Sequence, residues 1–355
     1  MKAIRHLLIT GGAGFIGANF THYWRQKYPN DRVVVLDALT YAGNSQNLEP
    51  LAKDVNFRFV QGDICDRPLI HLLLEEESID TVVHFAAESH VDRSILSPDA
   101  FIKTNVVGTF TLLDAFKHHW TINQRPDHYR FHHISTDEVY GSLDSIDPAF
   151  SETTAYSPNS PYSASKAGSD HLVNAYYHTY GLPVLMTNCS NNYGPYHFPE
   201  KLIPLMCINL MLGKPLPIYG DGQNIRDWLY VEDHCSAIEA VLTKAHPGAT
   251  YNVGGNNEIK NIDLVHMIGQ LMEELAPGLP VTPYEKLIQF VQDRPGHDRR
   301  YAIDATKIQT DLDWYPDFTV EEGLRLTVKW YLEHQSWWKP LLSEEYQAYY
   351  EKVYG

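Results

Sequence analysis

Residues 4–17 read IRHLLITGGAGFIG, an apolar run that leads directly into a cluster of glycines. The run from Ile4 to Thr10 predicts a buried β-strand, and the pattern from Phe15 onward is typical of a helix. A strand, a tight glycine turn and a helix in this order predict a dinucleotide site, because the free N–H groups at the start of the helix can hold a pyrophosphate. A tight turn without a nucleotide is the alternative interpretation.

Asp37 supports the nucleotide interpretation. It ends the second predicted strand, 20 residues after Gly17, where a carboxylate can accept hydrogen bonds from the ribose hydroxyls of an adenosine. The same carboxylate would repel a 2′-phosphate, so the sequence favours NAD over NADP. Asp63 and Ile64, which follow the third predicted strand, are candidate contacts of the adenine.

The rest of the first half alternates short β-branched runs with amphipathic stretches, which predicts βαβ units. We expect an α/β fold with a doubly wound parallel Rossmann-type sheet and a smaller mixed α/β C-terminal substrate domain. The NAD-binding domain is expected over residues 1–188 and the second domain over 189–355, with a soft boundary and some exchange of chain. The six predicted strands are 4–10, 32–37, 56–61, 81–86, 130–135 and 184–188, and the predicted helices include 15–27, 68–76, 98–120, 161–180, 201–212, 231–245, 263–275 and 319–334.

Composition excludes several classes of function. The 355-residue chain carries 28 Lys and Arg against 44 Asp and Glu, a net charge of −16, which opposes binding to nucleic acid. Four cysteines without C-x-x-C spacing predict neither zinc site nor disulfides, and the 18 histidines lack a metal-binding pairing, so we expect no metal. No window approaches the roughly 18 apolar residues of a membrane span, so we expect no membrane association and a cytoplasmic protein.

Tyr162 and Lys166 form a second candidate centre. They stand at positions i and i+4 of a predicted helix and therefore share one face. An adjacent ammonium and a positively charged nicotinamide ring would both lower the pKa of a tyrosine hydroxyl from its usual value of about 10. We expect Tyr162 to remove a hydroxyl proton while hydride leaves the same carbon. A chance spacing of two surface residues is the alternative.

The glycine motif, Y-x-x-x-K and a Ser or Thr that ends the fifth predicted strand resemble the extended short-chain dehydrogenase/reductase superfamily. Longer motifs resemble, in order and spacing, the dTDP-glucose 4,6-dehydratases within it, from residue 1 to about residue 335. These motifs are FAAESHVDRS (85–94), STDEVYG (135–141), YSASK (162–166), NCSNNYGPYHFPEKLIP (188–204), IRDWLYVEDH (225–234) and DRPGHDRRYAID (293–304).

Asp137 and Glu138 point to elimination of water. Oxidation or 4-epimerisation of a nucleotide sugar needs no carboxyl pair, whereas elimination needs one group to remove the C5 proton and another to protonate the hydroxyl that leaves C6. The resemblance implies Asp137 as the acid, Glu138 as the base and Thr136 as the residue that holds the sugar O4. It implies dehydration of dTDP-glucose to dTDP-4-keto-6-deoxyglucose by C4 oxidation, water elimination and hydride return to C6. The alternative interpretation is that Asp137 and Glu138 only begin a loop after a strand and have no catalytic role.

The resemblance also implies the members of each site. The catalytic residues are Thr136, Asp137, Glu138, Tyr162 and Lys166. The NAD contacts are Gly11, Gly14, Phe15, Ile16, Gly17, Asp37, Ala38, Leu39, Thr40, Asp63, Ile64, Ala86, Ala87, Ser89, Thr104, Tyr162, Lys166 and Asn192. The substrate contacts are Ser89, Thr136, Asn191, Asn192, Lys201, Leu202, Pro217, Ile218, Tyr219, Arg226, Asn261, Arg294, His297 and Tyr301. Arg226 and Arg294 suit a diphosphate, because a guanidinium can grip two oxygens at once; surface ion pairs are their alternative.

Three other functions remain open at this stage. A nucleotide-sugar 4-epimerase and a CDP- or GDP-sugar 4,6-dehydratase would use the same scaffold, and a non-catalytic NAD-binding sensor would be a different class of protein. The helices 98–120 and 161–180 carry apolar residues on more than one face, among them Phe101, Phe110 and Leu113. They therefore predict a homodimer, against the alternative of a larger monomer core.

Overall fold

A computed structural model describes residues 5–354. Its main element is a seven-stranded parallel sheet in the order β10-β6-β5-β4-β1-β2-β3. The order reverses between β1 and β4, which confirms the predicted doubly wound Rossmann-type fold. The strands are β1 (His6–Thr10), β2 (Arg32–Asp37), β3 (Phe57–Gln61), β4 (Thr81–His84), β5 (Arg130–Thr136), β6 (Val184–Cys189) and β10 (Thr250–Val253). Ile4, the predicted first residue of β1, lies outside the described residues.

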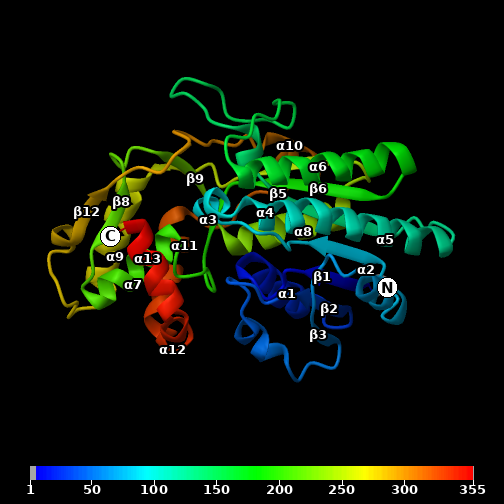
Figure 1. Cartoon of the computed structure of the whole chain (residues 1–355), viewed down its shortest axis with the longest axis horizontal. Helices are drawn as coiled ribbons and strands as arrows, with labels where there is room; N and C mark the ends of the chain where they lie inside the picture. The colour runs from blue at the N-terminus through cyan, green and yellow to red at the C-terminus, as the bar shows by residue number, and fades with distance from the viewer. Residues whose placement is uncertain (1–4, 355) are drawn as a thin grey trace.

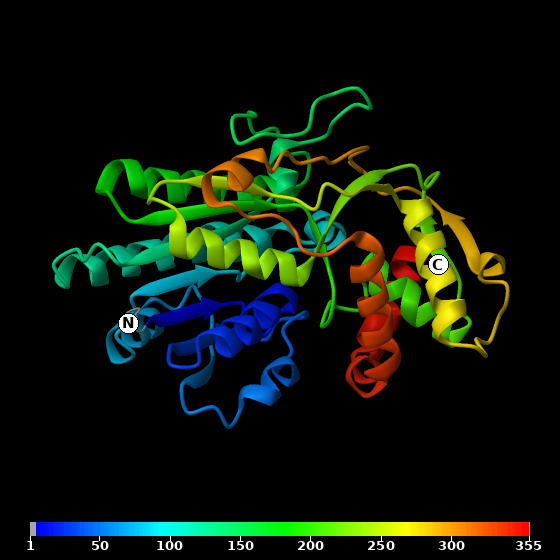
Figure 2. The same ribbon diagram turned by 180° about the vertical axis from the view of Figure 1, so that it is seen from behind.

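Helices cover both faces of this sheet (Figures 1 and 2). Alternate residues of β1 face opposite sides: Leu8 packs with α2, α5 and α6, whereas Leu7 and Ile9 pack with α1, α8 and α10. Both faces are therefore hydrophobic, as burial of a parallel sheet on two sides requires. The helices of these layers are α1 (Phe15–Lys27), α2 (Arg67–Glu76), α5 (Thr109–Ile122), α6 (Pro161–Tyr180), α8 (Val231–Lys244) and α10 (Thr306–Leu312).

The large sheet includes a strand from beyond residue 188. The prediction of six strands is wrong, because β10 pairs with β6 as the seventh strand. Its four residues follow α8 without a strongly β-branched run, so the pattern gave no separate strand signal. Residues 231–253 and 306–312 thus return to the layers built by the first half, while 188 itself falls inside β6.

Most of the remaining chain forms a second lobe with its own core. Two small sheets, β11-β9-β7 and β12-β8, pack with α7, α9 and α11 around buried residues such as Trp228 and Tyr331. The C-terminal helix α13 closes on this lobe, where Tyr346 is buried. The lobe consists of β7 (Asn191–Tyr193), α7 (Leu202–Leu212), β8 (Leu216–Tyr219), β9 (Ile225–Tyr230), β11 (Glu258–Lys260), α9 (Asn261–Leu275), η4 (Tyr284–Leu287), β12 (Ile288–Val291), α11 (Val320–Glu333), α12 (Gln335–Trp338), η5 (Lys339–Leu341) and α13 (Glu344–Tyr354).

The predicted helix 98–120 is interrupted. A π-helical turn, η2 (Ile102–Gly108), separates α4 (Pro98–Phe101) from α5, and it carries Thr104 toward the cavity described below. Other short helices were not predicted either, among them α3 (Val91–Leu96), η1 (Ser45–Leu51) and η3 (Asp137–Tyr140). Within residues 5–354, none of the helices is long and apolar enough to cross a membrane.

Candidate active site

One cavity, with a volume of about 460 Å³, lies where the carboxyl ends of the strands meet the second lobe. Residues after β1, β2, β4 and β5 line one end of it, and residues from 191 to 297 line the other. Ligands of doubly wound sheets bind at this edge, next to the point where the strand order reverses. The volume is within the usual range of small-molecule sites.

The glycine turn leaves no room for side chains at the first end of the cavity. Gly11 has a φ of +71°, and a Cβ atom on it would lie 2.6 Å from the backbone nitrogen of Ala86. A Cβ on Gly17 would lie 2.3 Å from the carbonyl oxygen of Gly11. Gly14 precedes α1 and offers no side-chain cap, so the first N–H groups of the helix are open to an anion. This cradle fits the pyrophosphate of a dinucleotide.

Asp37 is fixed beside this turn. Its two carboxylate oxygens accept hydrogen bonds from the backbone N–H groups of Ala13 (2.9 Å) and Leu39 (2.8 Å). Burial raises its pKa, and these bonds oppose that rise. Each oxygen keeps a second lone pair, and Asp37 lines the cavity, so the carboxylate can still accept a ribose hydroxyl.

Helix α6 presents Tyr162 and Lys166 to the middle of the cavity. Ser160 and Ser163 form a reciprocal capping box at its start, with Pro161 in the first turn. Tyr162 is 8% exposed and Lys166 is 4% exposed. The ammonium of Lys166 donates to the carbonyl oxygen of Ile134 at 2.8 Å, which ties the helix to β5.

The pKa of Tyr162 differs from the expectation. Burial raises it well above the usual value, and the charges of Glu138 and Asp137 add to the rise. Lys166 alone therefore does not lower it in the protein without ligand, because the prediction left out burial and the carboxyl pair. A cationic ring bound against the hydroxyl would supply the opposing effect.

Asp137 and Glu138 follow β5 directly and differ in environment. The hydroxyl of Thr136 accepts from the N–H of Glu138 (3.3 Å) and caps the η3 turn. Burial and the neighbouring Glu138 raise the pKa of Asp137 well above its usual range, and the Oδ2 atom of Asp137 has no hydrogen-bond partner among the described residues. The pKa of Glu138 is raised by burial but held back by Arg294, Arg226 and Lys201.

The second lobe brings cations to the other end of the cavity. Arg226 stacks on the ring of Tyr301 with its guanidinium carbon 4.2 Å from the ring centre, and it donates to the carbonyl oxygen of Asp298 at 2.9 Å. Arg294 forms an ion pair with Asp92 at 3.5 Å. The Lys201 ammonium contacts the carbonyl oxygen of Ser89 at 3.4 Å. These groups concentrate positive charge in an otherwise acidic protein.

All predicted site residues line this cavity except Leu39 and Tyr301. Leu39 packs against the core on the α1 side, and only its N–H serves the site, through Asp37. Tyr301 is 3% exposed and lies behind Arg226, with its hydroxyl bonded to Asp298. A residue in or next to a motif need not face the cavity, because neighbours in sequence can point in different directions. The individual roles of the lining residues remain predictions.

Several lining residues were not predicted. His197, Phe198 and Glu200 line the cavity, and the ring of His197 stacks on Phe15 at 4.2 Å. All three belong to the motif 188–204, so carrying over the whole motif would have found them. Tyr41 also lines the cavity, but it lies in a loop outside the quoted motifs.

Comparison with known proteins agrees with this geometry. The family model for GDP-mannose 4,6 dehydratase matches residues 8–327. The chain is 56% identical to dTDP-glucose 4,6-dehydratase of Neisseria meningitidis serogroup B, over 97% of this chain and 98% of that protein. It is 53% identical to the enzyme of the same name from Salmonella typhimurium, over 98% of each chain.

Solved structures give the same result. The crystal structure of dTDP-glucose 4,6-dehydratase from Bacillus anthracis in complex with NAD matches with a TM-score of 0.84 and 47% identity, over 95% of this chain and 99% of that one. DesIV, the dTDP-glucose 4,6-dehydratase of Streptomyces venezuelae, crystallised with NAD bound, matches with a TM-score of 0.86, 46% identity and the same coverage. The chain therefore belongs to the dTDP-glucose 4,6-dehydratase family of the extended short-chain dehydrogenase/reductases.

Proposed function

We propose that the chain dehydrates dTDP-glucose to dTDP-4-keto-6-deoxyglucose, with NAD as a coenzyme that is regenerated in every turnover. The observation that carries this proposal is the carboxyl pair Asp137 and Glu138, which stands at the end of β5 in the same cavity as Tyr162. An oxidation alone does not require two carboxyl groups in the cavity beside the catalytic tyrosine.

The cradle of Gly11, Gly14 and Gly17 and the carboxylate of Asp37 would hold NAD, with its nicotinamide toward Tyr162. NAD bound there would accept a hydride from the sugar C4 and return it to C6 while C5 is reprotonated. The chain's own residues supply the proton transfers. Tyr162 takes the proton of the O4 hydroxyl, and Thr136 holds that oxygen.

The ketone at C4 makes elimination possible. It acidifies the C5 proton, which a carboxylate could not remove from an ordinary sugar C–H. Glu138, whose charge is supported by Arg294 and Arg226, acts as the base at C5. Asp137, whose pKa is raised by burial and by the neighbouring Glu138, donates to the hydroxyl that leaves C6. The two environments therefore divide the roles of acid and base.

The second lobe binds the nucleotide. Arg226, Arg294 and Lys201 carry the charge needed for a diphosphate, with Asn191 and Asn261 as neutral partners. We place the thymine beside Pro217 to Tyr219. On this proposal residues 1–188 form the NAD-binding part and 189–355 the nucleotide-sugar part. Residues 231–253 and 306–312, which pack with the first part, support the sheet there.

Product analysis after incubation with dTDP-, UDP-, CDP- and GDP-glucose tests this function. A 4-keto-6-deoxy sugar absorbs in alkali, whereas a 4-epimer does not. We expect the signal with dTDP-glucose, and its absence, or equal turnover of all four sugars, would contradict the proposal. In Asp137→Asn and Glu138→Gln, C4 oxidation should persist while loss of the C6 oxygen slows, so that the reduced coenzyme accumulates on the enzyme.

The epimerase is the second candidate with structural support. UDP-glucose 4-epimerase of Thermotoga maritima shares the fold, with a TM-score of 0.81 and 27% identity over 93% of this chain and 99% of that one. The fold therefore does not separate the two reactions, and the carboxyl pair does. A non-catalytic NAD-binding sensor would not need the carboxyl pair Asp137 and Glu138.

We further propose a cytoplasmic homodimer. Ile102, Val107 and Phe110 are each at least 40% exposed on the η2–α5 segment, which runs alongside α6 (Figure 1). Phe101 and Leu113, two of the residues that predicted this surface, are buried within the subunit. Sedimentation should show a dimer that Phe110→Glu dissociates; a parent protein that sediments as a monomer would contradict this.

A further inference from the structure

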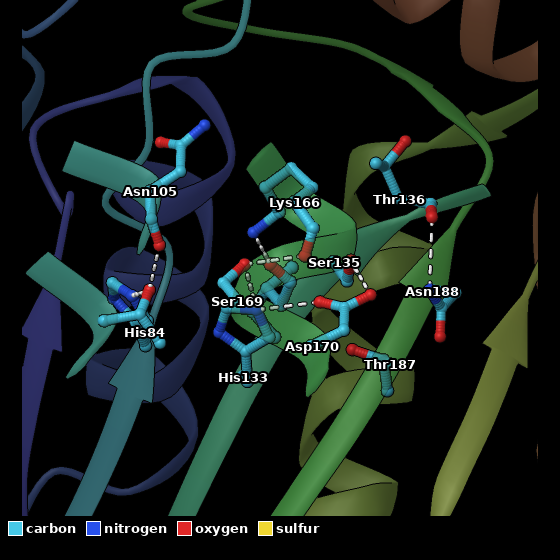
Figure 3. Close-up of polar contacts among 12 residues, drawn as sticks. His84, Asn105, His133, Ser135, Thr136, Lys166, Ser169, Asp170, Thr187 and Asn188 are labelled. Atoms are coloured by element: carbon cyan, nitrogen blue, oxygen red, sulfur yellow. Dashed lines mark hydrogen bonds and ion pairs between the residues drawn. The ribbon is translucent and has the colours of Figure 1, made fainter. Parts of the chain in front are cut away.

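A third polar residue lies below Tyr162 and Lys166 on α6. Asp170 follows Lys166 by four positions, so the three side chains share one face of the helix. Asp170 is 0% exposed and is not among the residues that line the cavity. Figure 3 shows it next to Lys166, with its carboxylate directed toward β5. A fully buried carboxylate is costly unless its charge is used or compensated.

Three donors hold this carboxylate in place. The Nε2 atom of His133 lies 3.0 Å from Oδ1, and the hydroxyls of Ser135 and Tyr156 donate to Oδ2 at 2.7 and 3.0 Å. His133 and Ser135 are alternate residues of β5 and therefore face α6 together. Burial raises the pKa of Asp170, but His133, Lys166 and Ser135 together bring it below the usual value. The group is therefore ionised at neutral pH.

Lys166 is buried, and no carboxylate within residues 5–354 bonds its ammonium directly. Its ammonium donates to the carbonyl oxygen of Ile134, which is neutral. Burial lowers the pKa of Lys166, and the charge of Asp170 is the largest effect that opposes the lowering, ahead of the Cys189 thiol. The carboxylate one turn away is thus the main support for a positive charge on the lysine.

The other titratable groups around the lysine do not replace this support. His84 on β4 and His133 on β5 are neutral at pH 7, because burial lowers the pKa of each. The thiol of Cys189 on β6 has a pKa raised to about 12 by burial, so it carries no charge. Asp137 and Glu138 on η3 act on the tyrosine, whose pKa they raise.

We propose that Asp170 is a positioning residue of the dehydratase reaction: its buried carboxylate keeps Lys166 positively charged beside Tyr162 and anchors the end of β5 on which Thr136 stands. The link to β5 runs through Ser135, and Asn188 completes it by donating to the carbonyl oxygen of Thr136 at 3.1 Å. The part played in the reaction rests on the proposed function. The charge on Lys166 does not, and it can be measured without turnover.

Asp170→Asn removes the charge and keeps the shape. The amide oxygen can still accept from His133, and the amide nitrogen can donate to a hydroxyl of Ser135 or Tyr156. Trace acetylation with acetic anhydride across a pH series, read at Lys166 by mass spectrometry, reports the pKa of that lysine in the protein without substrate. We expect the midpoint to fall by about one pH unit, the order of magnitude for removal of one charge near a buried ammonium.

Catalysis should change in the same direction. Because the ammonium is lost at a lower pH, the alkaline limb of the rate of C4 oxidation should move down by the same amount. The KM for the nucleotide sugar should stay unchanged, since Asp170 does not line the cavity. Asp170→Ser, which leaves room for a water among the three donors, serves if the carboxamide prevents folding.

Asp80→Asn is the matched control. Asp80 is also buried and hydrogen-bonded, to the N–H of His6 and the hydroxyl of Thr81, but it lies at the amino end of β4, the opposite edge of the sheet. In Asp80→Asn, the pH midpoint of Lys166 acetylation should equal that of the parent protein. An unshifted midpoint in Asp170→Asn, an equal shift in Asp80→Asn, or loss of the folded protein in both Asp170 variants would overturn the proposal. If the midpoint shifts in Asp170→Asn but the parent protein has no dehydratase activity, the electrostatic inference is supported and only the proposed function is contradicted.

Discussion

The two ends of the cavity bind by different means. The coenzyme end consists mainly of backbone, with the Asp37 carboxylate beside it: Gly11 and Gly17 bring the main chain close, and α1 offers its free N–H groups. The nucleotide-sugar end is made of charged side chains, chiefly Arg226 and Arg294. A backbone site is sensitive to added atoms and indifferent to pH, whereas a side-chain site is sensitive to charge, salt and pH. Tyr162 stands where the two ends meet.

Removal of the hydroxyl at this junction should have the largest effect. Tyr162→Phe leaves both binding ends intact but removes the base at O4, so we expect turnover to fall by about 10²–10⁴-fold. Single-turnover spectroscopy should show no formation of reduced coenzyme, while calorimetry shows unchanged binding of NAD and dTDP-glucose. A variant that oxidises C4 at the parent rate would show that another group is the base.

A methyl group at the coenzyme end should come next. Gly11→Ala places a Cβ atom 2.6 Å from Ala86 in a left-handed backbone conformation. Because the added methyl group would displace the turn against the backbone of Ala86, NAD affinity should fall by at least about tenfold. Gly181→Ala is the control: Gly181 has a φ of +68° at the end of α6 with nothing within 4 Å of a Cβ atom. It should lose stability and keep its NAD affinity; an equal loss of affinity in both would mean that general destabilisation explains the result.

A charge removed at the other end should act on the sugar. Arg294→Gln should raise the KM for dTDP-glucose by about 10–100-fold, the value of a charge-assisted hydrogen bond, without changing NAD affinity. Arg299→Gln is the control, because Arg299 lies five positions away in an exposed pair with Asp221. A similar KM increase in both variants would contradict the placement of the diphosphate at Arg294.

The same variant should also shift a pH profile. Arg294 lowers the pKa of Glu138, so its loss raises that pKa. The base is then protonated at a higher pH, and the acid limb of the elimination step should move upward. A limb that stays in place would mean that Glu138 is not the group that titrates.

Substitutions of helix N-caps should give the smallest effects. They should still distinguish a helix that carries site residues from one that does not. Ser160 and Thr319 both form capping boxes, at α6 and α11. Each change to Ala should lower the free energy of unfolding by about 1 kcal/mol, measured by denaturant titration. Only Ser160→Ala should also slow turnover, because α6 carries Tyr162 and Lys166. Equal rates in the two variants would show that the start of α6 is held by packing alone.

The difference between the two ends of the cavity also explains which features could be predicted from the sequence. The glycine turn, Asp37 and the strands β1 to β6 follow from local patterns, since strand period and turn chemistry are set by neighbouring residues. The substrate end was predicted by resemblance alone, because Arg226 on β9 and Arg294 in the loop after β12 are far apart in the sequence and carry no local signal.

Other features depend on packing that no local pattern records. β10 becomes a strand because β6 offers it an edge, and Tyr301 lies behind Arg226 because a ring fits there. The pKa of Tyr162 depends on packing too: burial and the carboxyl pair, which only the folded chain brings together, raise it.

The most direct test of the whole account follows one hydrogen atom. dTDP-glucose labelled with deuterium at C4 is converted by the protein with its bound coenzyme, and the product is analysed by NMR and mass spectrometry. If the hydride is held within the site and returned, the deuterium appears on the C6 methyl group. Deuterium lost to the solvent or released on free coenzyme would contradict the account.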